Sequence, residues 1–136
     1  GYETITDYWK DTGTPEDILN ANRQVLEHIC NQSDTTSFVE RTTQKYGLHL
    51  RDRCIIGKNC KIDDPARIGP HVSIGDNTII SSDVVIENSI IMSDCKIDGG
   101  LNIKDSIISA NCHLHGNNKD KTKKVFLLGE GTKITL

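Results

Sequence analysis

Apolar residues recur at an interval of six positions through residues 50–114. A column of large aliphatic side chains begins with Leu50, Ile56, Ile62, Ile68, Ile74, Ile80 and Ile86. A second column of mostly small side chains follows each of these by four positions, as Cys54, Cys60, Ala66, Val72, Thr78, Val84 and Ile90. The interval then shortens by one residue at two places. The large column continues as Ile91, Ile97, Ile103, Ile108 and Leu114, and the second as Cys95, Leu101, Ile107 and Cys112.

The pattern also repeats at a longer distance. Residues 85–97 (VIENSIIMSDCKI) and 102–114 (NIKDSIISANCHL) lie 17 residues apart and place a Ser, two Ile and a Cys at equivalent positions. Self-similarity at a fixed period is the signature of a solenoid, whereas an antiparallel β-sandwich would show turn clusters every ~8–12 residues. The sequence therefore predicts a mainly β fold, a parallel β-helix of about four coils over residues 50–119. Its short sides would stack as parallel strands ~4.8 Å apart.

One amphipathic helix is predicted before the repeat, from Pro15 to about Ile29. Thr14 and Asp17 form a capping box, and Pro15 suits the first helical position. The apolar positions that follow lie on one helical stripe. They are Ile18, Leu19, Val25, Leu26 and Ile29. A short strand over Glu3–Trp9 is expected before this helix.

These elements divide the chain into four parts. Residues 1–30 hold the strand and helix, and the polar stretch 31–49 is expected to be a linker. The β-helix occupies 50–119, and 120–136 are expected to close it as a C-terminal hairpin that turns at glycines. A β-helix leaves apolar surface that other copies of the chain can cover. The candidates for such an interface are Ile55, Ile79 and Ile107.

Composition narrows the classes of partner and compartment. Aromatic residues make up only 4% of the chain, so the core is expected to consist of Ile, Val and Leu. A net charge of −3 offers no field that attracts nucleic acid or an anionic membrane. No apolar run approaches the ~20 residues of a membrane span. Five cysteines without a CxxC pair favour a reducing, cytoplasmic location.

Several segments resemble known families. The segments IGPHVSIG (68–75), IENSII (86–91) and IKDSII (103–108) look like the carboxy-terminal coils of sugar-1-phosphate nucleotidyltransferases. The six-residue repeat as a whole is similar to left-handed parallel β-helix proteins with hexapeptide repeats. That resemblance implies left-handed coils and a homo-oligomer, with a trimer expected. YWKDTGTPEDILNANRQVL (8–26) and KKVFLLGEGTKITL (123–136) resemble sugar-1-phosphate nucleotidyltransferases, in particular the carboxy-terminal region of long-form glucose-1-phosphate thymidylyltransferases.

The nucleotidyltransferase resemblance implies a reaction for a longer parent protein. The parent would bind an NTP and a hexose-1-phosphate, and would form dTDP-glucose from dTTP and glucose-1-phosphate with release of pyrophosphate. Asp11 matches the family's Mg²⁺ ligand in the WxDTG motif, and Mg²⁺ would neutralise the phosphates during attack. The family's Gly-rich phosphate loop and its second Asp have no counterpart in these 136 residues. We therefore expect no catalytic residue, cofactor or activity in this chain alone.

A free-standing hexapeptide-repeat acyltransferase is the alternative. Such enzymes use a histidine as general base, and His71, His113 and His115 are the candidates. His71 falls at an outward corner position and His113 lies just outside the Cys112 column, so both are more simply explained as exposed polar residues. The basic run KDKTKK (119–124) is expected to be a solvated connection between the coil and the terminal hairpin. The alternative is a phosphate or regulatory nucleotide contact in the oligomer. The cysteines of the second column are expected to be small packing residues and not metal ligands.

Overall fold

The computed structural model describes residues 13–32, 37–39, 44–45, 49–50, 53–63, 65–81 and 83–136. The predicted strand Glu3–Trp9 and the candidate metal ligand Asp11 lie outside these residues. The predicted helix is confirmed as α2 (Pro15–Asn31). Thr14 caps it by accepting a hydrogen bond from the Asp17 backbone N–H at 3.1 Å.

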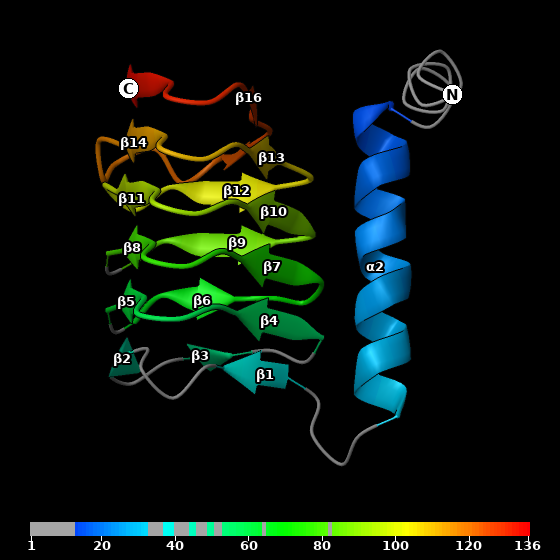
Figure 1. Ribbon diagram of the computed structural model, residues 1–136. Helices are drawn as coiled ribbons and strands as arrows, with labels where there is room; N and C mark the ends of the chain where they lie inside the picture. Colours follow the sequence, from blue (N-terminus) through cyan, green and yellow to red (C-terminus); the bar gives the residue numbers. More distant parts are fainter. Residues whose placement is uncertain are drawn as a thin grey trace.

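The strands form three parallel sheets that stack into a solenoid (Figure 1). Sheet A contains β1 (Ser37–Val39), β4 (Cys54–Ile56), β7 (Val72–Ile74), β10 (Ser89–Ile91), β13 (Ile107–Ile108) and β16 (Leu127–Leu128). Sheet B contains β2 (Gln44–Lys45), β5 (Lys61–Ile62), β8 (Ile79–Ile80), β11 (Lys96–Asp98), β14 (His113–His115) and β17 (Lys133–Thr135). Sheet C contains β3 (His49–Leu50), β6 (Arg67–Ile68), β9 (Val85–Glu87), β12 (Asn102–Lys104) and β15 (Lys123–Lys124).

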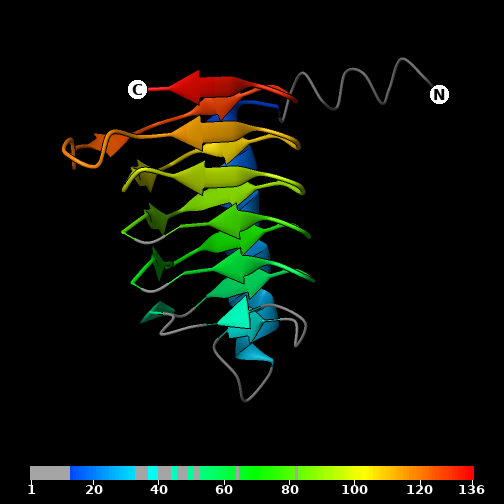
Figure 2. The same cartoon turned by 90° about the vertical axis from the view of Figure 1, so that its left-hand side faces the viewer.

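Each strand pairs in parallel with the strand three elements further along the chain, which is the topology of a three-sided coil. The side view in Figure 2 shows the turns stacked one above another. The solenoid has about five turns, one more than predicted. Strands β1 and β2, and His49 of β3, lie in the stretch expected to be a linker, and they contribute to the additional turn.

The C-terminal hairpin prediction is wrong. Strands β15, β16 and β17 do not pair with one another, but lie parallel to β12, β13 and β14. The reason is that the inner column continues: Leu128 is in register with Ile108, and Ile134 with Leu114. Phe126, Leu128 and Ile134 therefore extend the apolar core. A hairpin would leave that core uncovered.

The two predicted columns form the core, with one correction. The large column is buried from Ile56 to Leu114, but Ile90 and Ile107 are only half-buried and point outward. Ser89 and Ser106 are fully buried in their place. Because side chains alternate along a strand, an inward Ile91 requires an inward residue two positions earlier. The shortening of the repeat therefore falls before Ser89, at the corner.

The buried serines have hydrogen-bond partners for both of their polar roles. Ser89 Oγ donates to the Glu87 carbonyl at 2.8 Å and accepts from the Ser106 backbone N–H at 3.1 Å. Ser106 Oγ donates to the Lys104 carbonyl and accepts from the Phe126 backbone N–H, both at 2.8 Å. A buried hydroxyl without partners would destabilise the fold. These bonds allow serine to replace a small apolar residue in the two shorter corners.

Candidate functional site: the helix face and its groove

Helix α2 lies along the outer face of sheet A (Figures 1 and 2) and contacts β7 and β10. The outward column of that sheet is in register from one turn to the next, as Phe38, Ile55, Ser73, Ile90, Ile107 and Leu127. The helix buries Leu19, Leu26 and Cys30. The side of the helix that carries these three residues therefore covers an apolar sheet face of the same chain, whereas Val25 of the predicted stripe is 53% exposed.

Polar contacts at one corner of the coil hold the lower half of this helix. Glu27 Oε1 lies 2.8 Å from His71 Nε2, and Glu27 Oε2 lies 3.1 Å from Arg53 Nε. Arg53 Nη2 also donates to Asn31 Oδ1 at 3.2 Å. The hydrogen bond from His71, then that from Arg53, lowers the pKa of the Glu27 carboxyl. On strand β7, next to this corner, Ser73 Oγ donates a hydrogen bond to Asn22 Oδ1 of the helix at 2.7 Å.

The same corner continues upward to Asn88 and Asp105. Arg23 Nη1 donates to Asn88 Oδ1 at 3.0 Å, and Asn88 Nδ2 donates to Asp105 Oδ1 at 2.6 Å. The four corner residues Arg53, His71, Asn88 and Asp105 all have positive φ, between 44° and 64°. This left-handed conformation is one that Asn and Asp adopt more readily than most residues. It places each side chain at the same edge, where it can face the helix.

A groove opens where the helix begins. A cavity of ≈ 340 Å³ lies between its first turns and the upper coil, and a second of ≈ 150 Å³ adjoins it. Pro15 and Leu127 line both cavities, so we treat them as one helix–coil groove. Leu19 and Val125 add apolar walls to the larger part.

Comparison with known proteins identifies the family. A sequence model described as the GMPPB C-terminal domain matches residues 50–135, which covers most of the solenoid. The chain belongs to this family.

Relatives extend the match through the helix. The chain is 32% identical to the glucose-1-phosphate thymidylyltransferase of Streptomyces antibioticus over 97% of its own length, and 28% identical to the bifunctional protein GlmU of Methanococcus vannielii over 96%. It is 30% identical over 81% to the low-salt glycan biosynthesis nucleotidyltransferase Agl11 of Haloferax volcanii. It spans only 39%, 35% and 34% of these three relatives. The chain is thus a member of the sugar-1-phosphate nucleotidyltransferase family that corresponds to a C-terminal part of it.

The remaining sequence-predicted residues do not gather at one site. Among the predicted interface residues, Ile55 and Ile107 lie on the sheet face along which α2 runs, while Ile79 is 39% exposed on sheet B, away from the helix. The interface itself stays a prediction. His113 is exposed on sheet B, and His115 contacts Asp98. No group of three or more potential metal-ligating side chains occurs among the residues that the structure describes.

The cysteines of the second column act as hydrogen-bonding corner residues of this domain. Cys60 Sγ donates to the Gly75 carbonyl, and Cys95 Sγ to that of Ser109, both at 3.2 Å. Thr78 occupies the equivalent position in the turn between them and donates to Met92 at 3.1 Å. Burial is the main cause that raises the pKa of the Cys95 thiol. These side chains therefore pack in the core as predicted, and each also donates a hydrogen bond to a backbone carbonyl. The only sign of this bond in the sequence is that Thr replaces Cys at one of the equivalent positions.

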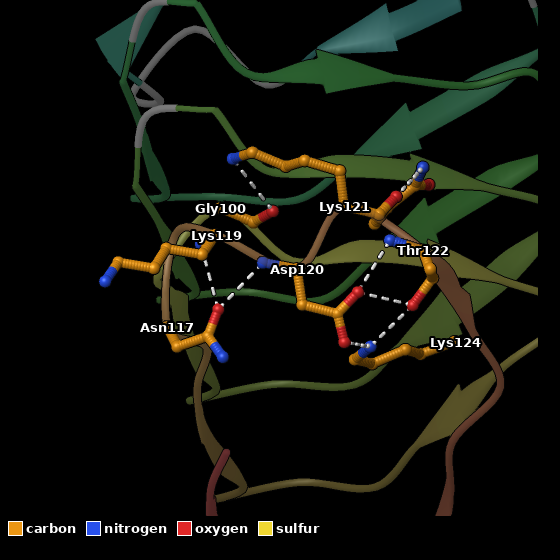
Figure 3. Close-up of polar contacts among 8 residues, drawn as sticks. Gly100, Asn117, Lys119, Asp120, Lys121, Thr122 and Lys124 are labelled. Atoms are coloured by element: carbon orange, nitrogen blue, oxygen red, sulfur yellow. Dashed lines mark hydrogen bonds and ion pairs between the residues drawn. The ribbon is translucent and has the colours of Figure 1, made fainter.

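The basic run lies in the loop between β14 and β15 and ends in β15 itself, which is Lys123–Lys124 (Figure 3). Asn117 Oδ1 accepts from the backbone N–H groups of Lys119 and Asp120, both at 2.9 Å. Asp120 accepts from Thr122 and lies 2.7 Å from Lys124 Nζ. The Lys124 ammonium, and then Thr122, hold the pKa of the Asp120 carboxyl well below its usual range. These internal contacts favour the connection over the phosphate contact for this run.

In the part of the chain that the structure covers, no helix is long and apolar enough to cross a membrane.

Proposed function

We propose that this chain is the scaffolding and oligomer-forming carboxy-terminal region of a sugar-1-phosphate nucleotidyltransferase. The family match over residues 50–135 carries this proposal. The geometry supports it, because α2 is attached to several successive turns through Glu27, Arg23 and Asn22. A domain connected through this helix would have a fixed orientation relative to the coil.

The parent protein would transfer a nucleotidyl group from dTTP to glucose-1-phosphate, forming dTDP-glucose and pyrophosphate. A phosphate oxygen of the sugar attacks the α-phosphorus, and the bond to the departing pyrophosphate breaks. Two relatives named glucose-1-phosphate thymidylyltransferase support this choice of nucleotide and sugar. The WKDTG motif supports Asp11 as a ligand of the Mg²⁺ that would neutralise charge during this step.

We also propose a homotrimer in the cytoplasm, with Mg²⁺ bound by the parent and no cofactor, nucleic acid or membrane bound by this chain. The support for self-association is the resemblance to hexapeptide-repeat coils, and exposed Ile79 is a candidate contact. The support for a reducing compartment is that Cys95 and Cys112, on adjacent turns, are buried thiols. Sedimentation tests the trimer, with an expected mass of three times 15.1 kDa.

The test of the reaction uses the longer polypeptide that carries the preceding domain. With Mg²⁺, dTTP and glucose-1-phosphate it should release pyrophosphate, and Asp11→Asn should slow release on the order of 10²-fold or more. The present chain alone should release none. If the longer protein transfers no nucleotidyl group to any hexose-1-phosphate, the proposed reaction is wrong.

A further inference from the structure

The helix–coil groove remains partly open because α2 begins beside β16, the last strand of sheet A. The outward column of sheet A ends at Leu127, next to Pro15, the first residue of the helix. The helix covers the residues of this column that come earlier in the chain, and the covered part of the column ends at the first turn of the helix. Val125 and Leu127 consequently remain 60% and 54% exposed.

This apolar surface differs from the scattered exposed residues elsewhere. Val125 and Leu127 are separated by one residue and line the same cavity as Pro15 and Leu19. By comparison, Val25, Ile79 and Met92 are exposed at separate places along the chain. Neighbouring exposed apolar side chains around a groove are typical of an interaction surface, whereas single ones are normal.

The polar residues of the groove mostly have partners within the chain. Arg23 donates to Asn88 and also to Asn20, the latter at 2.8 Å. Asp105 accepts from Asn88. Because these groups are already hydrogen-bonded, an incoming surface would cover them without leaving them unpaired. Burial of the apolar walls is thus the part of docking that would lower the free energy.

Chain continuity selects the occupant. The polypeptide enters the described fold at Gly13, two residues before Pro15 of the groove wall. The matched relatives are much longer, since this chain corresponds to 39% of the Streptomyces antibioticus protein. A domain joined directly upstream would be held at a high effective concentration beside the groove. A free partner would lack that advantage.

We propose that the helix–coil groove, lined by Pro15, Leu19, Val125 and Leu127, is the docking surface for the preceding nucleotidyltransferase domain of the same polypeptide. The proposal rests on the function proposed above. The docking surface of that domain would be apolar, because it must cover Val125 and Leu127. The groove then fixes the domain against the last turns of the coil, in addition to the covalent connection through α2.

The experiment compares backbone hydrogen exchange in the longer protein with that in the present chain. In the longer protein, residues 16–19 and 125–128 should exchange about tenfold more slowly than in this chain. Val125→Asp in the longer protein should abolish that difference. The matched control is Val25→Asp, and it should leave the difference unchanged. Val25 lies on α2, is 53% exposed against 60% for Val125, and lines neither cavity.

Two results overturn the docking proposal. One is equal exchange of the groove segments in both proteins. The other is that the groove segments already exchange slowly in the present chain, that their exchange becomes faster on dilution, and that Val125→Asp dissociates a dimer. The groove would then bind a second copy of the chain. Circular dichroism verifies that both variants fold. Nucleotidyl transfer is measured separately. If the longer protein transfers the nucleotidyl group but its groove segments are not protected from exchange, the docking proposal alone is wrong. If the groove segments are protected but the protein transfers no nucleotidyl group, the proposed reaction alone is wrong.

Discussion

Glu27 Oε1 lies 2.8 Å from Nε2 of His71, although 44 residues separate them in the sequence. The contact joins the helix to the coil and places the histidine in a structural pair. His71 is one of the three candidates that the sequence offers for the general base of an acyltransferase. Its ring nitrogen is instead directed at a carboxylate of the same chain, so the acyltransferase alternative gains no support from this residue.

Glu27 should make helix docking depend on pH. Its pKa is lowered from 4.5 in the folded chain, so its contribution is present above pH 4.5 and is lost as pH falls through the lower folded value. Glu27→Gln should therefore lower the urea midpoint at neutral pH and have less effect in acid. Urea unfolding of both proteins across this range measures the difference, with Glu16→Gln as an exposed control. A difference that does not change with pH would contradict the assignment.

Ser106→Ala should destabilise the solenoid although it removes only one oxygen. The substitution leaves the buried backbone N–H of Phe126 without its acceptor, and an unsatisfied buried group costs about 1–3 kcal/mol. Ser81→Ala, at a half-buried position outside the core columns, should change the free energy of unfolding by less than about 0.5 kcal/mol. Equal urea midpoints for the two variants would show that the Ser106 bond is unimportant.

Ile97→Ala should open a cavity in the middle of the coil. Ile97 is fully buried, and such truncations cost about 2–5 kcal/mol. Ile79→Ala makes the same chemical change one turn away, at a side chain that is 39% exposed, and should cost under about 1 kcal/mol in the dilute, unassociated chain. Denaturant unfolding at low protein concentration compares them. A larger loss for Ile79→Ala would indicate that this residue lies at a subunit interface.

Asp120→Ala should loosen the loop of Figure 3 without unfolding the solenoid. The carboxylate accepts from Thr122 and pairs with Lys124. Trypsin should then cleave after Lys119 or Lys121 several-fold faster, since local opening controls cleavage. Glu16→Ala serves as the control. Because the Asp120 pKa lies below its usual 3.8, the contacts of its carboxylate should persist down to about pH 3.8 and be lost only below it. Unchanged cleavage would mean that the loop does not depend on this carboxylate.

Much of the fold follows from local patterns. The six-residue interval predicts the strands and the inward large column, and Thr14-Pro15-Glu16-Asp17 predicts the start of α2. The errors at Ile90, at Ile107 and in residues 120–136 have the same origin. Nearby residues alone indicate the wrong spacing at these positions, because alternation within a strand and continuation of the stacked core determine the actual register. A change of one residue reverses which side chain faces inward.

The sequence by itself determined the coil, because a repeated pattern of large and small apolar residues gains buried area only when equivalent positions stack. Tertiary structure alone decided how the helix uses that coil. Pairing of Glu27 with His71 and Arg53, and the exposure of Val125 and Leu127, depend on where α2 lies against sheet A. Those contacts join residues far apart in the chain, so no periodicity records them. The groove is a consequence of this placement, since it lies between the first turns of the helix and the last turns of the solenoid.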